Sequence, residues 1–403
     1  MGLGRCVMSS QILTEQLKKQ ERLMDSLNGL ELRPHFRNIK LNSKGDLLIG
    51  PRGTGKSTYL LSQAAQFDNS LYLSLDDLKL INENLYEITE DAYNQGYRKL
   101  FLDEIHFYPN WSLVIKNIYD SFPKLKITLS DSSSLILRHG NADLSRRFPK
   151  ILLSLLSFRE YIYFKTKIEL PIFDPLIFFL NKKKLNIPEP LVYFIENENI
   201  NKLFLEFLDF GQRPFFVEGK YQERILNIIE KTIYTDIPYF LPSLRDTHLG
   251  ALKSIVGYLA SATIPTINIQ SLCSQWEIGK DKVYELLFVL EASGIIQIIY
   301  NTDTPKGHSK GDKILFQDCS FYNSLGGHIG NRREAYFVST LKQVGYKVMT
   351  SKNETMGDFK VNNILFEIGG KNKSIKKSDI VIKETLDRVY AKEWPLWIFG
   401  FLW

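Results

Sequence analysis

The stretch Leu47-Leu-Ile-Gly50-Pro-Arg-Gly-Thr-Gly55-Lys56-Ser57 decides the fold of the first third of this chain. Its last eight residues match the pattern G-x-x-x-x-G-K-[ST] of a phosphate-binding loop. The apolar residues before the loop predict a short strand, and Tyr59–Gln66 after it predicts a helix. Glycines let the backbone curl so that successive N–H groups face a phosphate, and the helix adds its positive N-terminus. This arrangement predicts a site for the phosphates of a nucleotide.

The loop also supplies side chains for phosphate chemistry. We expect Lys56 to neutralise the β- and γ-phosphates and the hydroxyl of Ser57 to ligate Mg²⁺. A nucleoside triphosphate and Mg²⁺ are therefore the expected cofactors. The residues predicted to bind the nucleotide are Gly50, Pro51, Arg52, Gly53, Thr54, Gly55, Lys56, Ser57 and Thr58.

A later apolar strand ends in two carboxylates. Leu71–Leu75 predicts a second strand, and Leu100–Glu104 predicts a third. The carboxyl end of a buried parallel strand is where an α/β sheet places its chemistry. We expect Asp103 to hold the Mg²⁺ shell and Glu104 to polarise the attacking water. The alternative is an apolar strand that runs into a solvated acidic turn, which the phosphate-binding loop upstream makes the weaker interpretation.

Two further segments of the same region carry candidate catalytic residues. A fourth strand, Lys126–Ser130, leads into Asp131-Ser-Ser-Ser134, whose hydroxyls, with that of Ser130, could contact the γ-phosphate or the attacking water. A polar turn that caps the next helix is an equally good interpretation. The pair Arg146-Arg147 is either a solvated face or the source of an arginine finger for a neighbouring subunit's γ-phosphate.

These residues resemble a family of prokaryotic AAA-type ATPases. The segments that carry the resemblance, in the family's order, are Gly50–Ser57, Leu100–His106, Thr128–Ser134, Ala142–Arg147 and Leu155–Tyr161. The resemblance implies ATP as the nucleotide, and it implies a small P-loop domain joined to a winged helix and a C-terminal restriction-endonuclease-like domain. The family has T-G-S-S-S where this chain has L-S-D-S-S. It has a Gly-Arg pair where this chain has Arg146-Arg147, so the resemblance implies Arg147 as the candidate arginine finger.

The expected fold class is α/β: an AAA-type P-loop parallel sheet, then a helical and winged-helix region, then a PD-(D/E)XK-like α/β domain. Residues 1–44 are expected to form an N-terminal helical segment, and the middle of the chain shows no chemistry. The remaining predicted boundaries are 45–165 for the ATPase domain, 166–245 for a helical linker region, 246–320 for the winged helix and 321–403 for the nuclease-like domain.

The winged-helix prediction rests on the order of elements. Three helical segments, 252–260, 269–276 and 282–293, precede two apolar strands at 294–300 and 313–316. The recognition helix would begin at residue 280. Such a module can read DNA, and it can also serve only to pack on the nucleotide domain, which is the interpretation we favour.

The last eighty residues resemble a PD-(D/E)XK nuclease. The candidate site residues are Glu334, Asp358, Glu367 and Lys371. In a working nuclease the carboxylates bind Mg²⁺ and the lysine positions the water. Here the lysine lies four residues after the glutamate instead of two, about 6.5 Å further along a strand. A degenerate fold used for binding is therefore the favoured interpretation, and cleavage is the alternative.

Composition limits the remaining classes. Hydrophobic residues make up 44% of the 403-residue chain and charged residues 24%, which is typical of a globular protein and not of a disordered one. The three cysteines, Cys6, Cys273 and Cys319, are too few and too scattered for a disulfide framework or a zinc site, so we expect a reducing, cytoplasmic compartment. No apolar run approaches the roughly 20 residues of a membrane helix, and the N-terminus lacks the apolar core of a signal peptide.

The sequence therefore predicts a protein that binds and hydrolyses ATP with Mg²⁺ to drive a conformational switch. One alternative is a nucleic-acid-processing protein in which ATP gates the nuclease-like domain, and another is an interaction module that holds a nucleotide with negligible turnover. The net charge of +6 permits a DNA partner, through the winged helix or the basic C-terminal domain. A protein partner or a homo-oligomer is also compatible with the sequence, and no membrane partner is expected.

Overall fold

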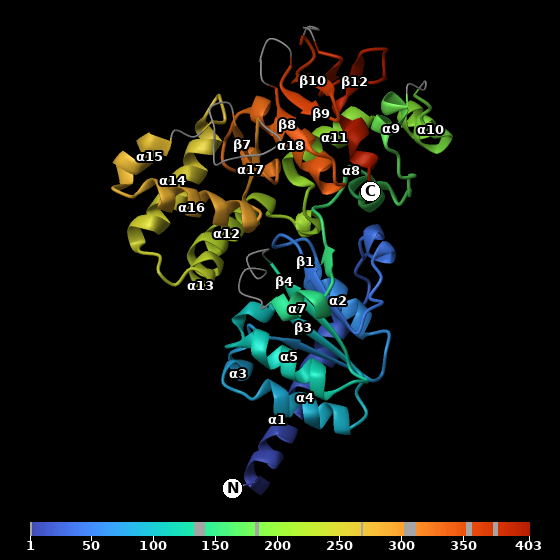
Figure 1. The fold of residues 1–403 in the computed structure, drawn as a ribbon. Coiled ribbons are helices and arrows are strands. Elements are labelled where there is room, and N and C mark those ends of the chain that lie inside the picture. The colour runs from blue at the N-terminus through green and yellow to red at the C-terminus, as the bar shows by residue number, and fades with distance from the viewer. Residues whose placement is uncertain are drawn as a thin grey trace. The chain divides into compact units, whose positions relative to one another are not determined.

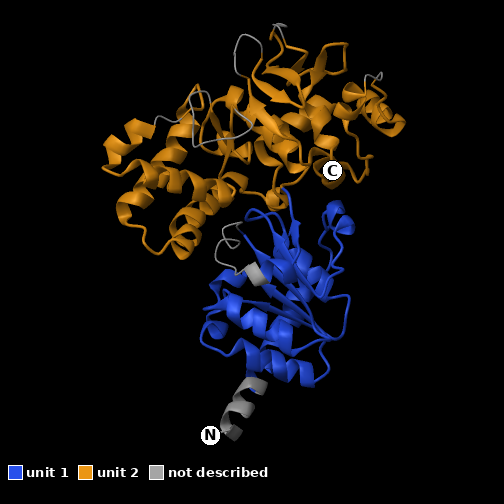
Figure 2. Cartoon of the chain, viewed as in Figure 1, with its two compact units in different colours: residues 1–154 blue, residues 155–403 orange. Residues whose placement is uncertain are grey.

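The computed structural model divides the chain into two compact units, residues 1–154 and 155–403 (Figure 2). The structure describes residues 2–132, 142–181, 185–266, 269–301, 312–351, 357–373 and 378–403. No helix among the described residues is long and apolar enough to cross a membrane.

The first unit is built on a five-stranded, entirely parallel sheet (Figure 1). Its strands are β1 (Gly45–Ile49), β2 (Ser70–Ser74), β3 (Lys99–Asp103), β4 (Lys126–Asp131) and β5 (Lys150–Leu152). Their spatial order is β2-β3-β4-β1-β5. The four strands predicted from apolar runs are thus confirmed, and the α/β fold with a parallel sheet fits a P-loop nucleotide-binding domain.

Helices precede β1 and connect the strands of this unit. They are α1 (Gly2–Asp25), α2 (Lys56–Ala64), α3 (Leu78–Ile81), α4 (Leu85–Asn94), α5 (Trp111–Ser121) and α7 (Ala142–Arg147), with short 3₁₀ turns at Pro34–Asn38 and Ile105–Phe107. The helix α2 packs on β2, β3 and β4, and its Tyr59 and Leu60 are fully buried against Leu48 and Phe101 of the sheet. This packing fixes the first turn of α2 directly above the carboxyl end of β1.

The N-terminal helix belongs to this unit because it completes the edge strand β2. The side-chain amide of Gln20 donates a hydrogen bond to the Ser70 carbonyl, with an N–O distance of 3.1 Å, and accepts one from the Tyr72 N–H at 2.6 Å. A buried glutamine thus satisfies backbone groups that an edge strand would otherwise leave unpaired.

The second unit begins with helices. They are α8 (Phe158–Thr166), α9 (Pro175–Leu180), α10 (Glu189–Asn197), α11 (Ile200–Phe210), α12 (Tyr221–Lys231), which runs through a π-helical turn at Thr232–Asp236, and α13 (Ile237–Phe240). The predicted helical character of residues 166–245 agrees with these elements. The helix α8 lies in the second unit, although the sequence analysis placed it at the end of the ATPase domain.

Three helices and a two-stranded sheet follow. They are α14 (Asp246–Ser261), α15 (Ile269–Trp276), α16 (Lys280–Ala292), and the antiparallel pair β6 (Ile296–Ile299) and β7 (Lys313–Phe316). This is the order of elements expected for a winged helix. The assignment of the module itself stays a prediction.

The chain ends in a second α/β layer. The helices α17 (Ser320–Ser324) and α18 (Ile329–Gln343) precede the strands β8 (Val348–Thr350), β9 (Phe359–Val361), β10 (Ile364–Gly369), β11 (Ile380–Lys383) and β12 (Glu393–Pro395), and a 3₁₀ turn spans Leu396–Phe401. The five strands form one mixed sheet in the order β12-β11-β10-β9-β8. Phe337 of α18 packs its ring on those of Phe366 and Phe399, which ties the helix to the sheet.

A buried ion pair anchors the turn before α12. Nε of Arg213 lies 2.7 Å from Oδ2 of Asp318, and both side chains are shielded from solvent. The neighbouring Gln212 accepts a hydrogen bond from the Cys319 N–H through its side chain and one from the Leu156 N–H through its carbonyl. The segment Gly211–Pro214, which had no assigned role in the sequence, thus joins three parts of the second unit.

Candidate functional site

The phosphate-binding loop lies where β1 ends and α2 begins. Gly53 and Gly55 have φ angles of 75° and 96°, in the left-handed region that favours glycine. Gly55 is the N-cap of α2 and makes no side-chain cap, so the first N–H groups of the helix face outward to a ligand. A Cβ atom on Gly50 would stand 2.2 Å from the Leu153 carbonyl oxygen, so this position has room only for glycine.

Arg33 holds the loop from behind. Its guanidinium is buried and donates hydrogen bonds to the carbonyls of Thr54, at 2.9 Å, and Ser154, at 2.8 Å. The hydroxyl of Thr54 in turn donates to the Pro51 carbonyl at 2.8 Å. The curled loop is therefore preorganised by contacts within the protein. Arg33, seventeen residues before Gly50, belongs to no motif that the sequence analysis identified.

Lys56 points into the loop. Its Nζ donates hydrogen bonds to the carbonyls of Gly50, at 2.7 Å, and Pro51, at 3.2 Å, and the side chain is almost entirely buried. Burial lowers the pKa of Lys56, and the nearby carboxylates of Glu104 and Asp103 oppose that shift. A buried ammonium group surrounded by carbonyl oxygens is suited to exchange one of them for a phosphate oxygen.

Asp103 ends β3 and is held by two hydroxyl groups. The hydroxyl of Ser130 donates a very short hydrogen bond to Oδ1, and that of Tyr72 donates one to Oδ2 at 2.9 Å. Burial and the Asp103 charge together raise the pKa of Tyr72 well above its usual range, so it stays a donor. The predicted Mg²⁺ ligand is thus oriented, and Ser130 acts on it directly.

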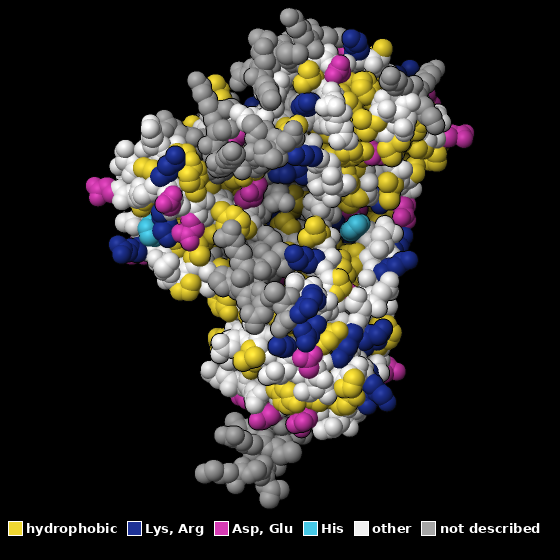
Figure 3. Space-filling view, viewed as in Figure 1, with side chains coloured by type: hydrophobic (Ala, Val, Ile, Leu, Met, Phe, Trp, Pro, Cys, Tyr) yellow, Lys and Arg dark blue, Asp and Glu magenta, His cyan; other side chains and the backbone are white. Residues whose placement is uncertain are grey.

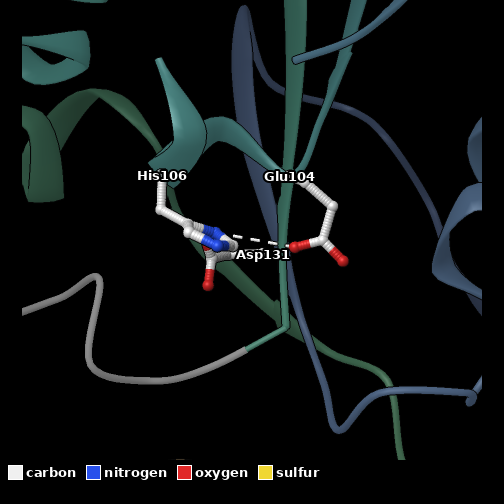
Figure 4. Close-up of side chains that lie close together, drawn as sticks. All are labelled: Glu104, His106 and Asp131. Carbon is white, nitrogen blue, oxygen red and sulfur yellow. Dashed lines mark hydrogen bonds and ion pairs between the residues drawn. The ribbon is translucent and has the colours of Figure 1, made fainter. Parts of the chain in front are cut away.

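Glu104 follows with a left-handed backbone, φ 51° and ψ 51°. This conformation is costly for a non-glycine residue and is typical of functional positions. Nη1 of Arg52 lies 3.6 Å from Oε1, and Nδ1 of His106 lies 3.5 Å from Oε2 (Figure 4). Burial raises the pKa of Glu104, opposed by the charges of Lys56 and Arg52. The carboxylate is therefore held between two cationic or polar groups beside the loop.

His106 and Asp131 form a buried pair next to Glu104. Nδ1 of His106 lies 2.7 Å from Oδ2 of Asp131, and neither side chain is exposed. Glu104, His106 and Asp131 bring one possible metal-ligand atom each to within 4.8 Å of one another, and they are the group found with this property among the described residues. Two nitrogen or oxygen ligands of one tetrahedral ion stand about 3.4 Å apart. The 2.7 Å between His106 Nδ1 and Asp131 Oδ2 is the distance of a hydrogen bond, so in this arrangement the two side chains orient each other.

The sheet register explains why these residues meet. Asp131 is the register partner of Ile49, the last residue of β1, and the Gly50 N–H donates to the Asp131 carbonyl at 3.3 Å. Parallel strands bring their carboxyl ends to one edge, so β1, β3 and β4 deliver the loop, Asp103 and Asp131 to the same place.

The other predicted residues of this region lie as follows. Ser57 is exposed on the first turn of α2 and Thr58 is half-buried beside it. Arg147 lies at the amino edge of the sheet, opposite the loop. Its main-chain carbonyl oxygen is next to Gly45, the first residue of β1, and would be 2.9 Å from a Cβ atom placed there. Its Nη2 forms an ion pair with Asp120 Oδ2 at 3.1 Å. Arg147 therefore does not join the loop of its own chain. Ser133 and Ser134 lie outside the described residues.

Residues 42–162 match the sequence profile of the AAA domain family. The match supports an AAA-type P-loop fold for this segment. The match contains the loop, Asp103, Glu104, His106 and Asp131, and it supports ATP binding.

Other comparisons add little about activity. The chain is 28% identical over 385 residues to the uncharacterized protein MJ1637 of Methanocaldococcus jannaschii, covering 86% of this chain and 79% of that one. AMPPCP-bound DnaA from Aquifex aeolicus is 14% identical, with a TM-score of 0.28 over 69% of this chain and 88% of DnaA. The S. cerevisiae Hsp104–ADP complex is 16% identical, with a TM-score of 0.28 over 70% of this chain and 41% of Hsp104. Such low scores carry no argument about this chain.

Each of the C-terminal candidate carboxylates has a partner of its own. Oε2 of Glu334 lies 2.9 Å from Lys313 Nζ, and burial raises the pKa of Glu334 against the opposing charge of Lys313. Asp358 accepts a hydrogen bond from the Ile368 N–H at 2.7 Å. In the described part of the chain, Glu334, Asp358 and Glu367 do not form a group whose oxygens could share one metal ion without rearrangement.

The lysine that reaches Glu367 is Lys373, not Lys371. Nζ of Lys373 lies 2.6 Å from Oε1 of the fully buried Glu367, whereas Lys371 is exposed. The side chain of Lys373 crosses Gly369, where a Cβ atom would stand 2.5 Å from Lys373 Cγ. Gly369 therefore makes room for the side chain of Lys373.

Proposed function

We propose that the chain hydrolyses ATP with Mg²⁺, using Glu104 as the group that activates water. The observation that carries this proposal is the position of the Glu104 carboxylate, held between Arg52 and His106 at the edge of the sheet where Lys56 also lies. A carboxylate of raised pKa beside a phosphate-binding loop is suited to accept a proton from water.

The residues of the site fit a magnesium nucleotide. The curled backbone of the loop, with Gly53 and Gly55 in left-handed conformations, offers N–H groups to the phosphates. Ser57 and Asp103 would hold Mg²⁺ through oxygen atoms, the ligand type that this ion prefers. When bound, the ion neutralises charge on the phosphate oxygens. Lys56 binds the β- and γ-phosphates, and Ser130 keeps Asp103 in place.

The nucleotide state would act as a conformational switch. Arg52 belongs to the loop and contacts Glu104, so a γ-phosphate that attracts Arg52 also changes the surroundings of the catalytic carboxylate. Arg147, at the far edge of the sheet, would serve as an arginine finger only for a second copy of the chain. We therefore propose a homo-oligomer as the form in which hydrolysis is fastest.

The test compares the wild type with Lys56→Ala in two assays. Binding of a fluorescent ATP analogue and release of phosphate are measured across a range of protein concentrations. We expect Lys56→Ala to lose both, and wild-type turnover per chain to rise with protein concentration. Wild-type binding without turnover above the Lys56→Ala level would contradict hydrolysis and favour a module that only holds the nucleotide.

A second candidate is a nucleic-acid-processing protein in which ATP gates the C-terminal domain. It is favoured by the contact between Lys373 and Glu367, which places a lysine beside a buried carboxylate near Glu334 and Asp358. Residues 246–320 would act as a winged helix with α16 as the recognition helix. Mg²⁺-dependent cleavage of DNA by the wild type, abolished in Glu367→Ala and Lys373→Met but kept in Lys371→Ala, would support this candidate. A wild type that never cleaves would remove it.

A further inference from the structure

The amino edge of the parallel sheet in the first unit carries a row of basic residues. The strands β3 and β4 begin at Lys99 and Lys126, and these two lysines are register partners. Lys44 directly precedes β1, and its carbonyl accepts a hydrogen bond from the Ile127 N–H. The strand β5 begins at Lys150. Four neighbouring strands, β3, β4, β1 and β5, thus each start at or directly after a lysine.

Further basic residues lie along the same edge. The Arg98 carbonyl accepts a hydrogen bond from the Lys126 N–H. Figure 3 shows Lys and Arg side chains gathered on the surface of this unit. We call the set the basic edge; its members are Lys44, Arg98, Lys99, Lys124, Lys126, Arg147 and Lys150.

Few acidic groups offset these charges. Asp46 is buried within β1, and Asp120 is engaged in an ion pair with Arg147. Asp68, two residues before β2, is exposed at the end of the row. The basic edge therefore has a clear excess of positive charge, opposite to the edge that holds the phosphate-binding loop.

Repulsion between these lysines is unfavourable for the fold, and it is offset in part where Lys44 lies over the Tyr119 ring and Lys99 over the Phe67 ring. Like charges on directly opposed strand residues destabilise a sheet. Burial lowers the pKa of Lys99, and the charge of Lys126 lowers it further. Burial and the charge of Arg147 act in the same way on the pKa of Lys44, and Asp120 opposes them. A bound polyanion would turn this repulsion into attraction.

We propose that the basic edge binds the phosphate backbone of a nucleic acid. The register aligns Lys99, Lys126 and Lys44, whereas Lys150 is the register partner of Leu47 and lies about 10 Å further along the strand direction. Neighbouring strands are about 4.8 Å apart, so the three aligned lysines span about 10 Å. Phosphates follow one another at about 3.4 Å along each DNA strand, so this row matches roughly three phosphates. A line of single charges fits a linear polyanion better than a flat anionic membrane. This surface is distinct from the winged helix and from the basic C-terminal region that the sequence suggested.

The test measures binding of a labelled DNA duplex of about 20 base pairs to the full chain, between about 50 and 200 mM salt. The variant has Lys124→Ala, Lys126→Ala and Lys150→Ala, all exposed side chains. The matched control removes the same charge elsewhere on the unit, through Lys18→Ala, Arg22→Ala and Lys79→Ala. ATP-analogue binding and the unfolding midpoint of each protein verify the fold.

We expect the edge variant to bind at least about tenfold more weakly at low salt and to lose about 0.9 of the salt slope for each phosphate contact removed. The control keeps wild-type binding. The unfolding midpoint of the edge variant stays the same or rises, because repulsion is removed. A wild type that does not bind DNA at low salt, or equal losses in both variants, would overturn the proposal. The proposal would also be overturned if DNA binding were lost only in a further variant, Lys280→Ala/Lys282→Ala on α16. Binding of the wild type to anionic vesicles but not to DNA would overturn it as well.

Discussion

Nδ1 of His106 lies 2.7 Å from Oδ2 of Asp131 and 3.5 Å from Oε2 of Glu104. One buried imidazole therefore stands between the carboxylate proposed to activate water and a second carboxylate on a different strand. An imidazole fixed by a carboxylate keeps one orientation, as in other sites where a third group orients the catalytic pair. We expect this pair to position the Glu104 carboxylate that it lies beside.

Substitution of either member of the His106–Asp131 pair should slow ATP hydrolysis without weakening the binding of the nucleotide. We expect Asp131→Asn, which keeps the shape and loses the charge, to lower kcat about tenfold, and His106→Ala to lower it by about tenfold to a hundredfold. The KM for ATP should change little, because we expect the pair to act through Glu104, the group proposed to activate water. Steady-state kinetics separate the two parameters. A rise of about tenfold to a hundredfold in the KM for ATP with unchanged kcat would show instead that the pair serves nucleotide binding.

Removing the positive charge of Arg52 or the negative charge of Asp131 near Glu104 should shift the pH profile of kcat in opposite directions. The base acts when deprotonated, so kcat falls as the pH falls through the pKa of Glu104. Burial raises that pKa, Arg52 lowers it and Asp131 raises it. Arg52→Gln should therefore move the acidic limb of kcat to higher pH, and Asp131→Asn should move it to lower pH. Identical limbs in both variants and the wild type would assign the limb to another group.

A methyl group on Gly50 should damage the loop. Its Cβ would meet the Leu153 carbonyl at 2.2 Å, and a backbone atom cannot move aside. We expect Gly50→Ala to lower the free energy of unfolding by about 1–3 kcal/mol and to abolish binding of an ATP analogue. Gly257→Ala in α14 is the control, because its Cβ would enter open space and alanine favours a helix. Normal nucleotide binding by Gly50→Ala would refute the steric argument.

Replacing one partner of the Arg213–Asp318 ion pair should lower the free energy of unfolding of the second unit. Removal of one member of a buried pair typically costs about 3–5 kcal/mol, because the other charge stays buried and unpaired. Urea unfolding of Arg213→Met should show a loss of this size. The double variant Arg213→Met/Asp318→Leu should lose less than the two single changes together. Lys220→Ala, at an exposed ion pair with Glu223, should have almost no effect. Additive losses in the double variant would contradict the coupling.

Much of the first unit could be predicted from the sequence because its signals are local. The loop is a contiguous motif, and each strand is a short apolar run that ends at a polar residue. The roles of Asp103 and Glu104 followed from their place at a strand end. The contact of His106 with Asp131 could not be predicted, since it depends on the order and register of β3, β4 and β1.

The same limit explains the other residues that the sequence did not reveal. Arg33 reaches the loop from a 3₁₀ turn at a distance in sequence that no motif encodes. Lys373 replaces Lys371 beside Glu367 because the chain turns back across Gly369. Lys99 and Lys126 form a row only when the strands are aligned. In each case the decisive fact is a contact across the fold, not a pattern along the chain.

The most direct test of the account is phosphate release by Glu104→Gln at saturating ATP, with ATP-analogue binding measured on the same protein. Glutamine keeps the size of the side chain and cannot accept the proton. The account predicts that turnover falls by about a hundredfold or more while the nucleotide stays bound. Turnover equal to that of the wild type would remove Glu104 from the mechanism and with it the central claim.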